Sequence, residues 1–173
     1  RDKLVTGVQN VCSSDLDDYN TLYRNRGDGS FAVASPAAGL AEPSLPRLGF
    51  GTSFLDYDND RDLDLFVANY RQPAKLLRNI CDSDNSWLTV KAAGTDSNRD
   101  AIGARVTVLA GGTTQIREIS GGSGQMGQNM MAAHFGLGNA TIADSVTVTW
   151  PSGKVITLTD VSANQRLTIT EPR

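Results

Sequence analysis

Apolar and polar residues alternate clearly in the second half of the chain. At 145–150, Val146, Val148 and Trp150 alternate with serine and threonine, which is typical of a strand with one buried and one solvated face. Gly111-Gly112 lies between two such stretches and indicates a hairpin. Strands are predicted at 87–91, 105–109, 115–119, 145–150, 154–158 and 165–170. Since no helical stripe appears, we expect an all-β domain here, a small antiparallel β-sandwich.

The first half alternates less regularly and is divided by turns. Residues 20–31 predict a short strand, a Gly-Asp-Gly turn and the start of a second strand. A further strand is predicted by the apolar run at 65–68, and 35–47 is a loop rich in Pro, Ala and Ser. The pattern Leu-x-Arg-Asn ends at Asn25 and again at Asn79, which gives an internal repeat of 54 residues (79 minus 25).

Charge separates the two halves and limits the function classes. Residues 1–97 hold 14 of the 19 acidic and 10 of the 16 basic side chains, so 98–173 holds 5 and 6. We therefore place a boundary near 94–98. A net charge of −3 gives no signature of nucleic-acid binding. No apolar run approaches the roughly 20 residues of a membrane span, and Cys12 and Cys81 form neither a disulfide framework nor a CxxC zinc motif.

The acidic side chains gather in one stretch, with an aspartate at every second position of 56–64. At about 4 Å two such charges repel by about 1 kcal/mol in water and about 4 kcal/mol at an effective dielectric constant near 20. A hard cation such as Ca²⁺ relieves this repulsion, because it takes six to eight oxygen ligands from loops with acids at positions 1, 3, 5 and 9 and a main-chain carbonyl at position 7. The predicted calcium site comprises the side chains of Asp56, Asp58, Asp60 and Asp64 and the carbonyl of Asp62.

The acidic stretch has two other interpretations. It can be a merely solvated acidic turn, and that alternative stays open. An EF-hand is excluded because its loop needs Glu at position 12 and flanking helices, whereas position 12 is Val67 and the flanks read as strands.

Residues on both sides of the loop resemble the FG-GAP/VCBS repeat of integrin-type β-propellers: Gly49-Phe50-Gly51 before it and Leu63-Asp64-Leu65-Phe66-Val67-Ala68-Asn69 after it. The resemblance implies a propeller blade with a calcium loop between two strands. Arg61 occupies the position where the family has Gly, so we expect weakened calcium affinity if φ must be positive there. The resemblance to this repeat also implies that Arg26-Gly27-Asp28 is a plain turn within the blade. The alternative is an adhesive ligand, because integrins recognise the same tripeptide.

Several ordered motifs in the second half resemble the ASPIC/UnbV domain, which often follows such repeats in secreted proteins similar to the cartilage acidic protein family. The matching segments are Ser97-Asn98-Arg99-Asp100-Ala101-Ile102-Gly103-Ala104-Arg105-Val106, Ser120-Gly121-Gly122-Ser123-Gly124, His134-Phe135-Gly136-Leu137-Gly138, Trp150-Pro151-Ser152-Gly153 and Asn164-Gln165. The predicted organisation is thus a propeller blade at 17–86, about one blade of a β-propeller, and a β-domain at 87–173.

Residues 1–16 are predicted to be a non-native leader. The stretch 5–16 resembles the translation of a sequencing adapter with a frame slip near Asn10, the alternative being an ordinary polar linker. Such a segment carries no information about the native fold. Its deletion is expected to change the free energy of unfolding by less than about 0.5 kcal/mol, as for other uncoupled surface changes.

No catalytic residue is predicted. The segment 122–127 formally matches GxGxxG but lacks the helix and acidic residue of a dinucleotide site, and His134 is the single histidine. We therefore expect a non-enzymatic, extracellular, periplasmic or cell-surface calcium-binding interaction or adhesion module of a larger secreted repeat protein. Its expected partners are upstream propeller blades of the same protein and an extracellular protein or carbohydrate. The alternative is a non-catalytic accessory domain of a secreted enzyme whose catalytic part lies upstream.

Overall fold

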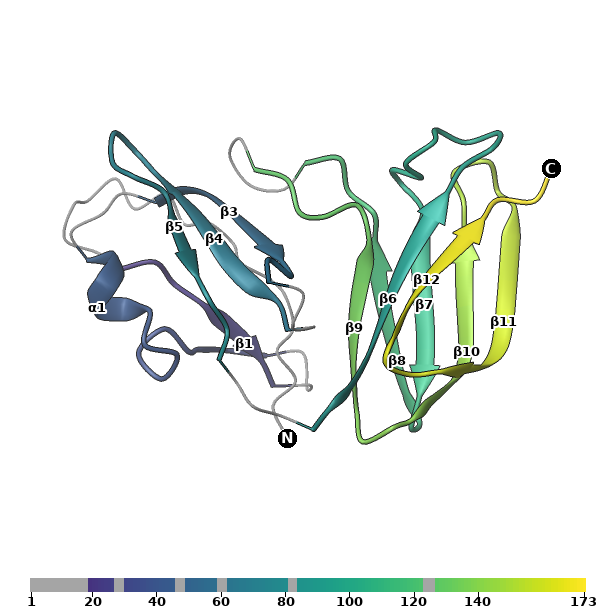
Figure 1. The fold of residues 1–173 in the computed structure, drawn as a ribbon, viewed down its shortest axis with the longest axis horizontal. Helices are drawn as coiled ribbons and strands as arrows, with labels where there is room; N and C mark the ends of the chain where they lie inside the picture. Colours follow the sequence, from purple (N-terminus) through teal and green to yellow (C-terminus); the bar gives the residue numbers. More distant parts are fainter. Residues whose placement is uncertain (1–18, 27–29, 46–48, 59–61, 81–83, 123–126) are drawn as a thin grey trace. The chain divides into compact units, whose positions relative to one another are not determined.

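The computed structural model describes residues 19–26, 30–45, 49–58, 62–80, 84–122 and 127–173 (Figure 1). These ranges contain twelve strands and one helix of four residues, so the predicted all-β fold is confirmed. The chain divides into two units, Arg1–Ile80 with Gly122–Asn129, and Cys81–Gly121 with Met130–Arg173.

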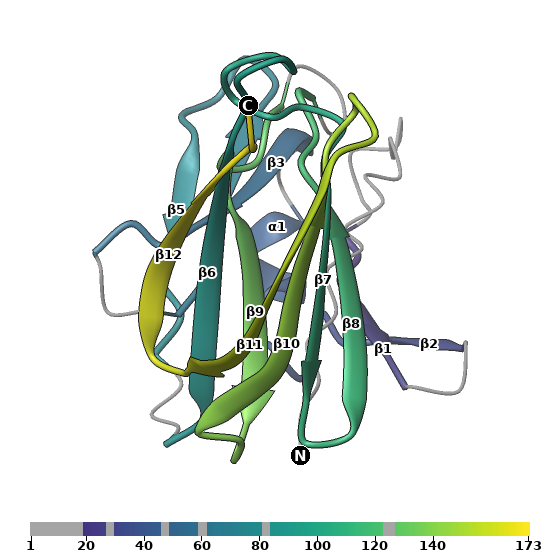
Figure 2. The same ribbon diagram turned by 90° about the vertical axis from the view of Figure 1, so that its right-hand side faces the viewer.

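The second unit consists of two sheets that enclose one apolar core (Figure 2). One sheet has the strand order β12-β6-β9 and the other β11-β10-β7-β8. The strands are β6 (Ser86–Ala93), β7 (Arg105–Ala110), β8 (Thr113–Glu118), β9 (Ala133–Gly138), β10 (Ile142–Thr149), β11 (Val155–Ser162) and β12 (Gln165–Thr170). Eighteen buried apolar residues, contributed by both sheets and by the segments that connect their strands, form the core cluster.

The period-two pattern explains which side chains enter this core. Val146, Val148 and Trp150 are buried on the inner face, whereas Thr147 and Thr149 between them are not. Gly111 and Gly112 form the predicted hairpin between β7 and β8, with φ values of 54° and 71°. Positive φ at both positions is required by the two-residue turn that matches the strand twist, and glycine adopts it without a steric penalty.

Two features of this unit differ from the sequence prediction. β9 was not predicted, although Ala133, Phe135 and Leu137 alternate inward along it. β12 runs parallel to its neighbour β6, so one pair departs from the expected antiparallel arrangement. Strand direction follows from the path of the intervening chain, which a local pattern does not contain.

The first unit contains a two-stranded and a three-stranded sheet. β1 (Tyr23–Asn25) and β2 (Phe31–Val33) form an antiparallel pair, which confirms the two predicted strands; the Gly-Asp-Gly turn between them lies outside the described residues. β3 (Gly49–Leu55), β4 (Asp64–Asn69) and β5 (Lys75–Leu77) form an antiparallel sheet in that order. Gln128 and Asn129 also belong to this unit, and they bond to β3 at Ser53 and Phe54.

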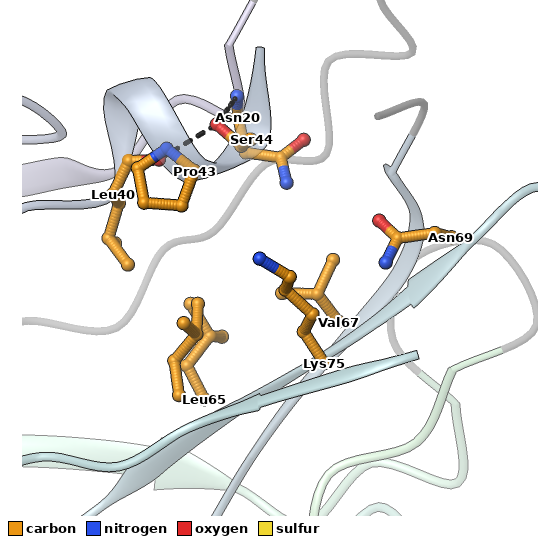
Figure 3. A pocket seen from close by; sticks show the side chains of 9 residues that line it. Asn20, Leu40, Pro43, Ser44, Leu65, Val67, Asn69 and Lys75 are labelled. Carbon is orange, nitrogen blue, oxygen red and sulfur yellow. Dashed lines mark hydrogen bonds between the residues drawn. The ribbon is translucent and has the colours of Figure 1, made fainter. Parts of the chain in front are cut away.

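A short helix lies beside the three-stranded sheet. α1 (Ala41–Ser44) lies in the segment predicted as a loop, and Ser44 Oγ accepts a hydrogen bond from the amide of Asn20 at 2.9 Å. A small cavity of about 20 Å³ remains between the helix and the strands (Figure 3). It has room for about one water molecule. Its lining is mainly apolar: Asn20, Leu40, Pro43, Ser44, Leu65, Val67, Asn69, Lys75 and Leu77.

Candidate metal centre

The acidic stretch is the connection of a β-hairpin. β3 ends at Leu55, and Leu55 pairs with Asp64, the first residue of β4. The loop 56–63 therefore begins and ends at neighbouring positions of the sheet. The hairpin thus brings the two described ends of the aspartate-rich segment together, whereas a continuous strand would spread its carboxylates along one face.

Three carboxylates converge in this loop. One oxygen each of Asp56, Asp58 and Asp64 lies within 4.8 Å of the other two. Asp64 is fully buried, Asp56 is partly buried and Asp58 is exposed. Like charges at this separation repel most strongly where burial lowers the effective dielectric constant. The cluster is therefore suited to binding a cation through oxygen donors.

Asp64 is held by backbone amides from two elements. The amide of Tyr57 donates to Oδ2 at 2.9 Å, and the amide of Asn79 donates to Oδ1 at 2.8 Å. These bonds compensate a carboxylate that burial would otherwise destabilise. They also fix its position between the loop and the chain beyond β5, and each oxygen keeps a second lone pair for another partner.

Asp58 has a cationic partner within the chain. Its carboxylate forms an ion pair with Nε of Arg78, whose side chain is 61% exposed. The Asp58 side chain is 25% exposed, so solvent screens the pair only in part, and the pair contributes on the order of 1 kcal/mol. Arg78 can therefore leave Asp58 at little cost when a better cation is present.

The remaining predicted calcium ligands are Asp60 and Asp62. Asp60 lies outside the described residues, and so does Arg61, which occupies the loop position where the family has glycine. Gly27 and Asp28 of the predicted blade turn also lie outside them. Asp62 is described, and its carboxylate is not a member of the three-residue cluster; its predicted contribution was the main-chain carbonyl. Sequence reasoning did not find Arg78 and Asn79, although the repeated Leu-x-Arg-Asn pattern marked both.

A second acidic centre, which the sequence did not predict, lies in the second unit. Glu171 is only 2% exposed, and its Oε2 accepts hydrogen bonds from the amides of Thr95 (2.7 Å), Asp96 (2.9 Å) and Ser97 (2.8 Å). Its Oε1 accepts from the hydroxyls of Ser97 (3.0 Å) and Ser152. Burial alone raises the pKa of Glu171, but these hydroxyl and amide donors outweigh it and lower the pKa to about 2. The Glu171 carboxylate thus connects the loops that contain Ser97 and Ser152 to the end of β12.

The other motifs that bear on chemistry are the single histidine and the GxGxxG match. His134 lies on β9, where Nδ1 is 3.0 Å from the hydroxyl of Thr89 and the ring is parallel to that of Trp87. Four of the six residues of the GxGxxG match, 123–126, lie outside the described residues. Within the part of the chain that the structure describes, no helix has the length and apolarity needed to cross a membrane.

Comparison with known families identifies two families, one in each half of the chain. Residues 6–67 match the FG-GAP-like repeat, and residues 94–173 match the family described as ASPIC and UnbV. The chain thus contains an FG-GAP-like repeat and an ASPIC/UnbV domain. The FG-GAP match begins inside the predicted non-native leader, and residues 1–18 lie outside the described structure, so that leader stays a prediction.

The chain is also homologous to cartilage acidic protein 1. It is 34% identical to the human protein over 161 residues, which cover 90% of this chain and 24% of the relative. The mouse protein is 34% identical over 142 residues (80% and 21%), and the Xenopus tropicalis protein 35% identical over 113 residues (63% and 17%). The chain thus spans a quarter or less of the length of these relatives. Neither the families nor the relatives are named for an enzymatic activity.

Proposed function

We propose that this chain is a non-enzymatic, extracellular calcium-binding module that serves in interaction or adhesion as part of a larger secreted repeat protein. The observation that carries the proposal is the convergence of Asp56, Asp58 and Asp64 within 4.8 Å in the hairpin loop of an FG-GAP-like repeat. The similarity to cartilage acidic protein 1 supports the extracellular location.

The donor set fits a hard divalent cation. Calcium prefers carboxylate and carbonyl oxygens and tolerates irregular coordination. Asp64 is held in place by two backbone amides, so it offers a carboxylate whose position is fixed before a cation arrives. Asp56 and Asp58 supply oxygens from the start of the loop. A bound calcium ion would supply the positive charge that holds these three carboxylates together, and Arg78 would compete with it for Asp58.

The first unit also carries an apolar surface suited to packing against further propeller blades. Phe66 and Leu76 pair across β4 and β5, and each side chain is 39% exposed. Neighbouring exposed apolar side chains on a sheet are characteristic of an interaction surface. β5 is the edge strand of its sheet, and no described strand pairs with its outer side. We infer that this face packs against other blades of the longer protein.

Calcium binding is tested by titrating the full chain with CaCl₂ in a calorimeter. Extracellular calcium modules bind with dissociation constants of about 10⁻⁴–10⁻³ M, and we expect a value in this range. Asp58→Ala should abolish the binding heat. Asp58 is the best position for this test because it is exposed, whereas Asp64 also holds the loop together.

Two further variants make the titration specific. Asp144→Ala removes an exposed aspartate from β10 of the second unit, and it should leave calcium binding unchanged. Arg78→Gln removes the competing cation and should tighten binding a few-fold. The proposal would be refuted by an absence of binding at 10 mM calcium, a concentration about tenfold above the weak end of the expected range, or by equal affinities of Asp58→Ala and the parent chain.

A further inference from the structure

The outward face of the β12-β6-β9 sheet combines aromatic rings with cationic side chains. Alternation places Leu88, Val90 and Phe135 in the core, so the intervening residues point outward. Arg166 pairs with Thr89, which in turn pairs with His134, so these residues form one row across the three strands. The remaining outward positions are Trp87, Lys91 and Ala93 on β6, Gly136 and Gly138 on β9, and Thr168 and Thr170 on β12.

The two rings on this face are held in fixed positions. Their planes are within 8° of parallel, with centroids 6.1 Å apart. The backbone of Trp87 is bound on both sides by Asn164, whose Oδ1 accepts from the Trp87 amide at 3.1 Å and whose amide donates to the Trp87 carbonyl at 2.7 Å. His134 is fixed by the 3.0 Å contact between Nδ1 and the hydroxyl of Thr89. Aromatic rings fixed on strands bind a ligand at little cost in conformational entropy.

Space is open over two glycines of β9, next to the half-buried rings of Trp87 and His134. Trp87 pairs with Gly136 in the sheet, and a Cβ atom added to Gly136 or Gly138 would meet no atom within 4 Å. The edge strand β9 therefore presents backbone without side chains next to the aromatic pair. A ligand can approach the rings closely along this strand.

The charge of this face is positive. Lys91 and Arg166 are both exposed, and no outward position of the three strands carries an acidic residue. Hydroxyls of Thr168 and Thr170, both exposed, add hydrogen-bonding groups along β12. The face thus combines two parallel aromatic rings, one of indole and one of imidazole, with hydroxyls and two cations.

We propose that this face binds a polysaccharide that carries carboxylate groups. Sugar rings have an apolar C–H face that packs on aromatic rings, hydroxyls that bond to threonine, and in uronic acids a carboxylate that pairs with Lys or Arg. A nucleic acid fits less well, because two exposed cations neutralise few phosphates and the whole chain has a net charge of −3. An acidic polysaccharide would be the partner in the proposed interaction function, and the proposal rests on that function for this role alone.

The test is a titration of the full chain with oligogalacturonate, with a neutral glucan oligosaccharide and a single-stranded oligonucleotide as comparison ligands. EDTA is present throughout, because polyuronates themselves bind calcium. Binding is followed by calorimetry and by tryptophan fluorescence. Of the two tryptophans, Trp150 is 2% exposed in the core, so a fluorescence change on binding reports Trp87.

We expect Trp87→Ala to weaken oligogalacturonate binding about tenfold, the scale of one lost aromatic contact, and Trp87→Phe to retain most of it. Replacing both Lys91 and Arg166 with Gln should weaken it at least as much. Arg105→Gln is the matched control, because Arg105 is an exposed cation on β7 of the other sheet, and it should bind like the parent. A thermal melt of each variant shows whether the fold is retained.

The proposal fails if oligogalacturonate does not bind, if the neutral glucan or the oligonucleotide binds as tightly, or if Arg105→Gln weakens binding as much as the Lys91 and Arg166 replacements. It also fails if Trp87→Ala is folded and binds normally. If Trp87→Ala does not fold, Trp87→Phe and the charge variant decide the result. Asp58→Ala should bind oligogalacturonate like the parent chain, so failure of the calcium proposal and failure of this one are distinguished.

Discussion

The second unit buries eighteen apolar residues in one cluster, whereas among the described residues of the first unit Val67 alone is a buried apolar residue. The contrast appears in strand length as well. β6, β10 and β11 each have eight residues, but β1, β2 and β5 have three each. Short strands with little buried apolar surface gain little free energy of folding. A repeat unit of this kind typically depends on neighbours or ligands for its stability, and an ASPIC/UnbV domain with its own core does not.

The largest difference between the units is expected from matched phenylalanine truncations. Phe135 is fully buried in the second unit, and Phe66 is 39% exposed in the first. Phe135→Ala should lower the free energy of unfolding by about 3–5 kcal/mol, and Phe66→Ala by about 1 kcal/mol or less. Urea denaturation followed by circular dichroism measures both, and tryptophan fluorescence follows the second unit alone, because Trp87 and Trp150 both belong to it. Equal losses would contradict the contrast between the two units.

A smaller effect is expected on association. The Phe66–Leu76 pair is proposed to pack against other blades, so in their absence it should cause the chain to self-associate. Replacing both residues with Lys should weaken self-association about tenfold or more in sedimentation velocity, because two charges would then oppose burial of this face. Ile116→Lys changes a 53% exposed residue of the second unit and should have no such effect. Equal association of all three proteins would remove this surface from the proposal.

The second unit has its own acid-sensitive connection at Glu171. Because the folded pKa of about 2 lies below the usual 4.5, this carboxylate stabilises the fold above pH 4.5, and the contribution is lost as the pH falls toward 2. Glu171→Gln should lower the melting temperature at neutral pH, and the difference from the parent should shrink between pH 4.5 and about 2. Glu118→Gln, at an exposed position of β8, is the control. A difference that is constant with pH would show that the charge of Glu171 does not hold the loops.

The sequence predicted the second unit better than the first for a physical reason. In stretches such as 145–150, apolar and polar residues alternate because one face of the strand is buried and the other is solvated. The strands in these stretches were predicted correctly. β9 was missed because Gly136 and Gly138 replace the outward side chains that would have made its alternation visible. Glu171 continues the inward phase of Leu167 and Ile169, and that signal marks a buried acid, but its partners at 95–97 lie more than seventy residues away.

The candidate site could be predicted only in its local part. Alternating aspartates indicated a cation loop, and the hairpin brings Asp56, Asp58 and Asp64 together because its two strands pair directly. The contacts made by Arg78 and Asn79 depend on how β5 returns beside β4, which is a tertiary feature. A spacing pattern identifies the ligands that a loop offers, and the tertiary fold determines which groups hold or oppose them.

The central claim is that calcium stabilises the first unit and leaves the second unit unchanged. Hydrogen exchange of the full chain, measured by mass spectrometry in EDTA and in millimolar calcium, tests it directly. Millimolar calcium is about one to ten times the expected dissociation constant, so linkage adds about 0.4–1.4 kcal/mol. We expect slower exchange in β3, β4 and the chain through Asn79, with no change in β6, β7, β10 and β12, and no calcium effect in Asp58→Ala. Identical exchange with and without calcium, or equal slowing in both units, would contradict the account.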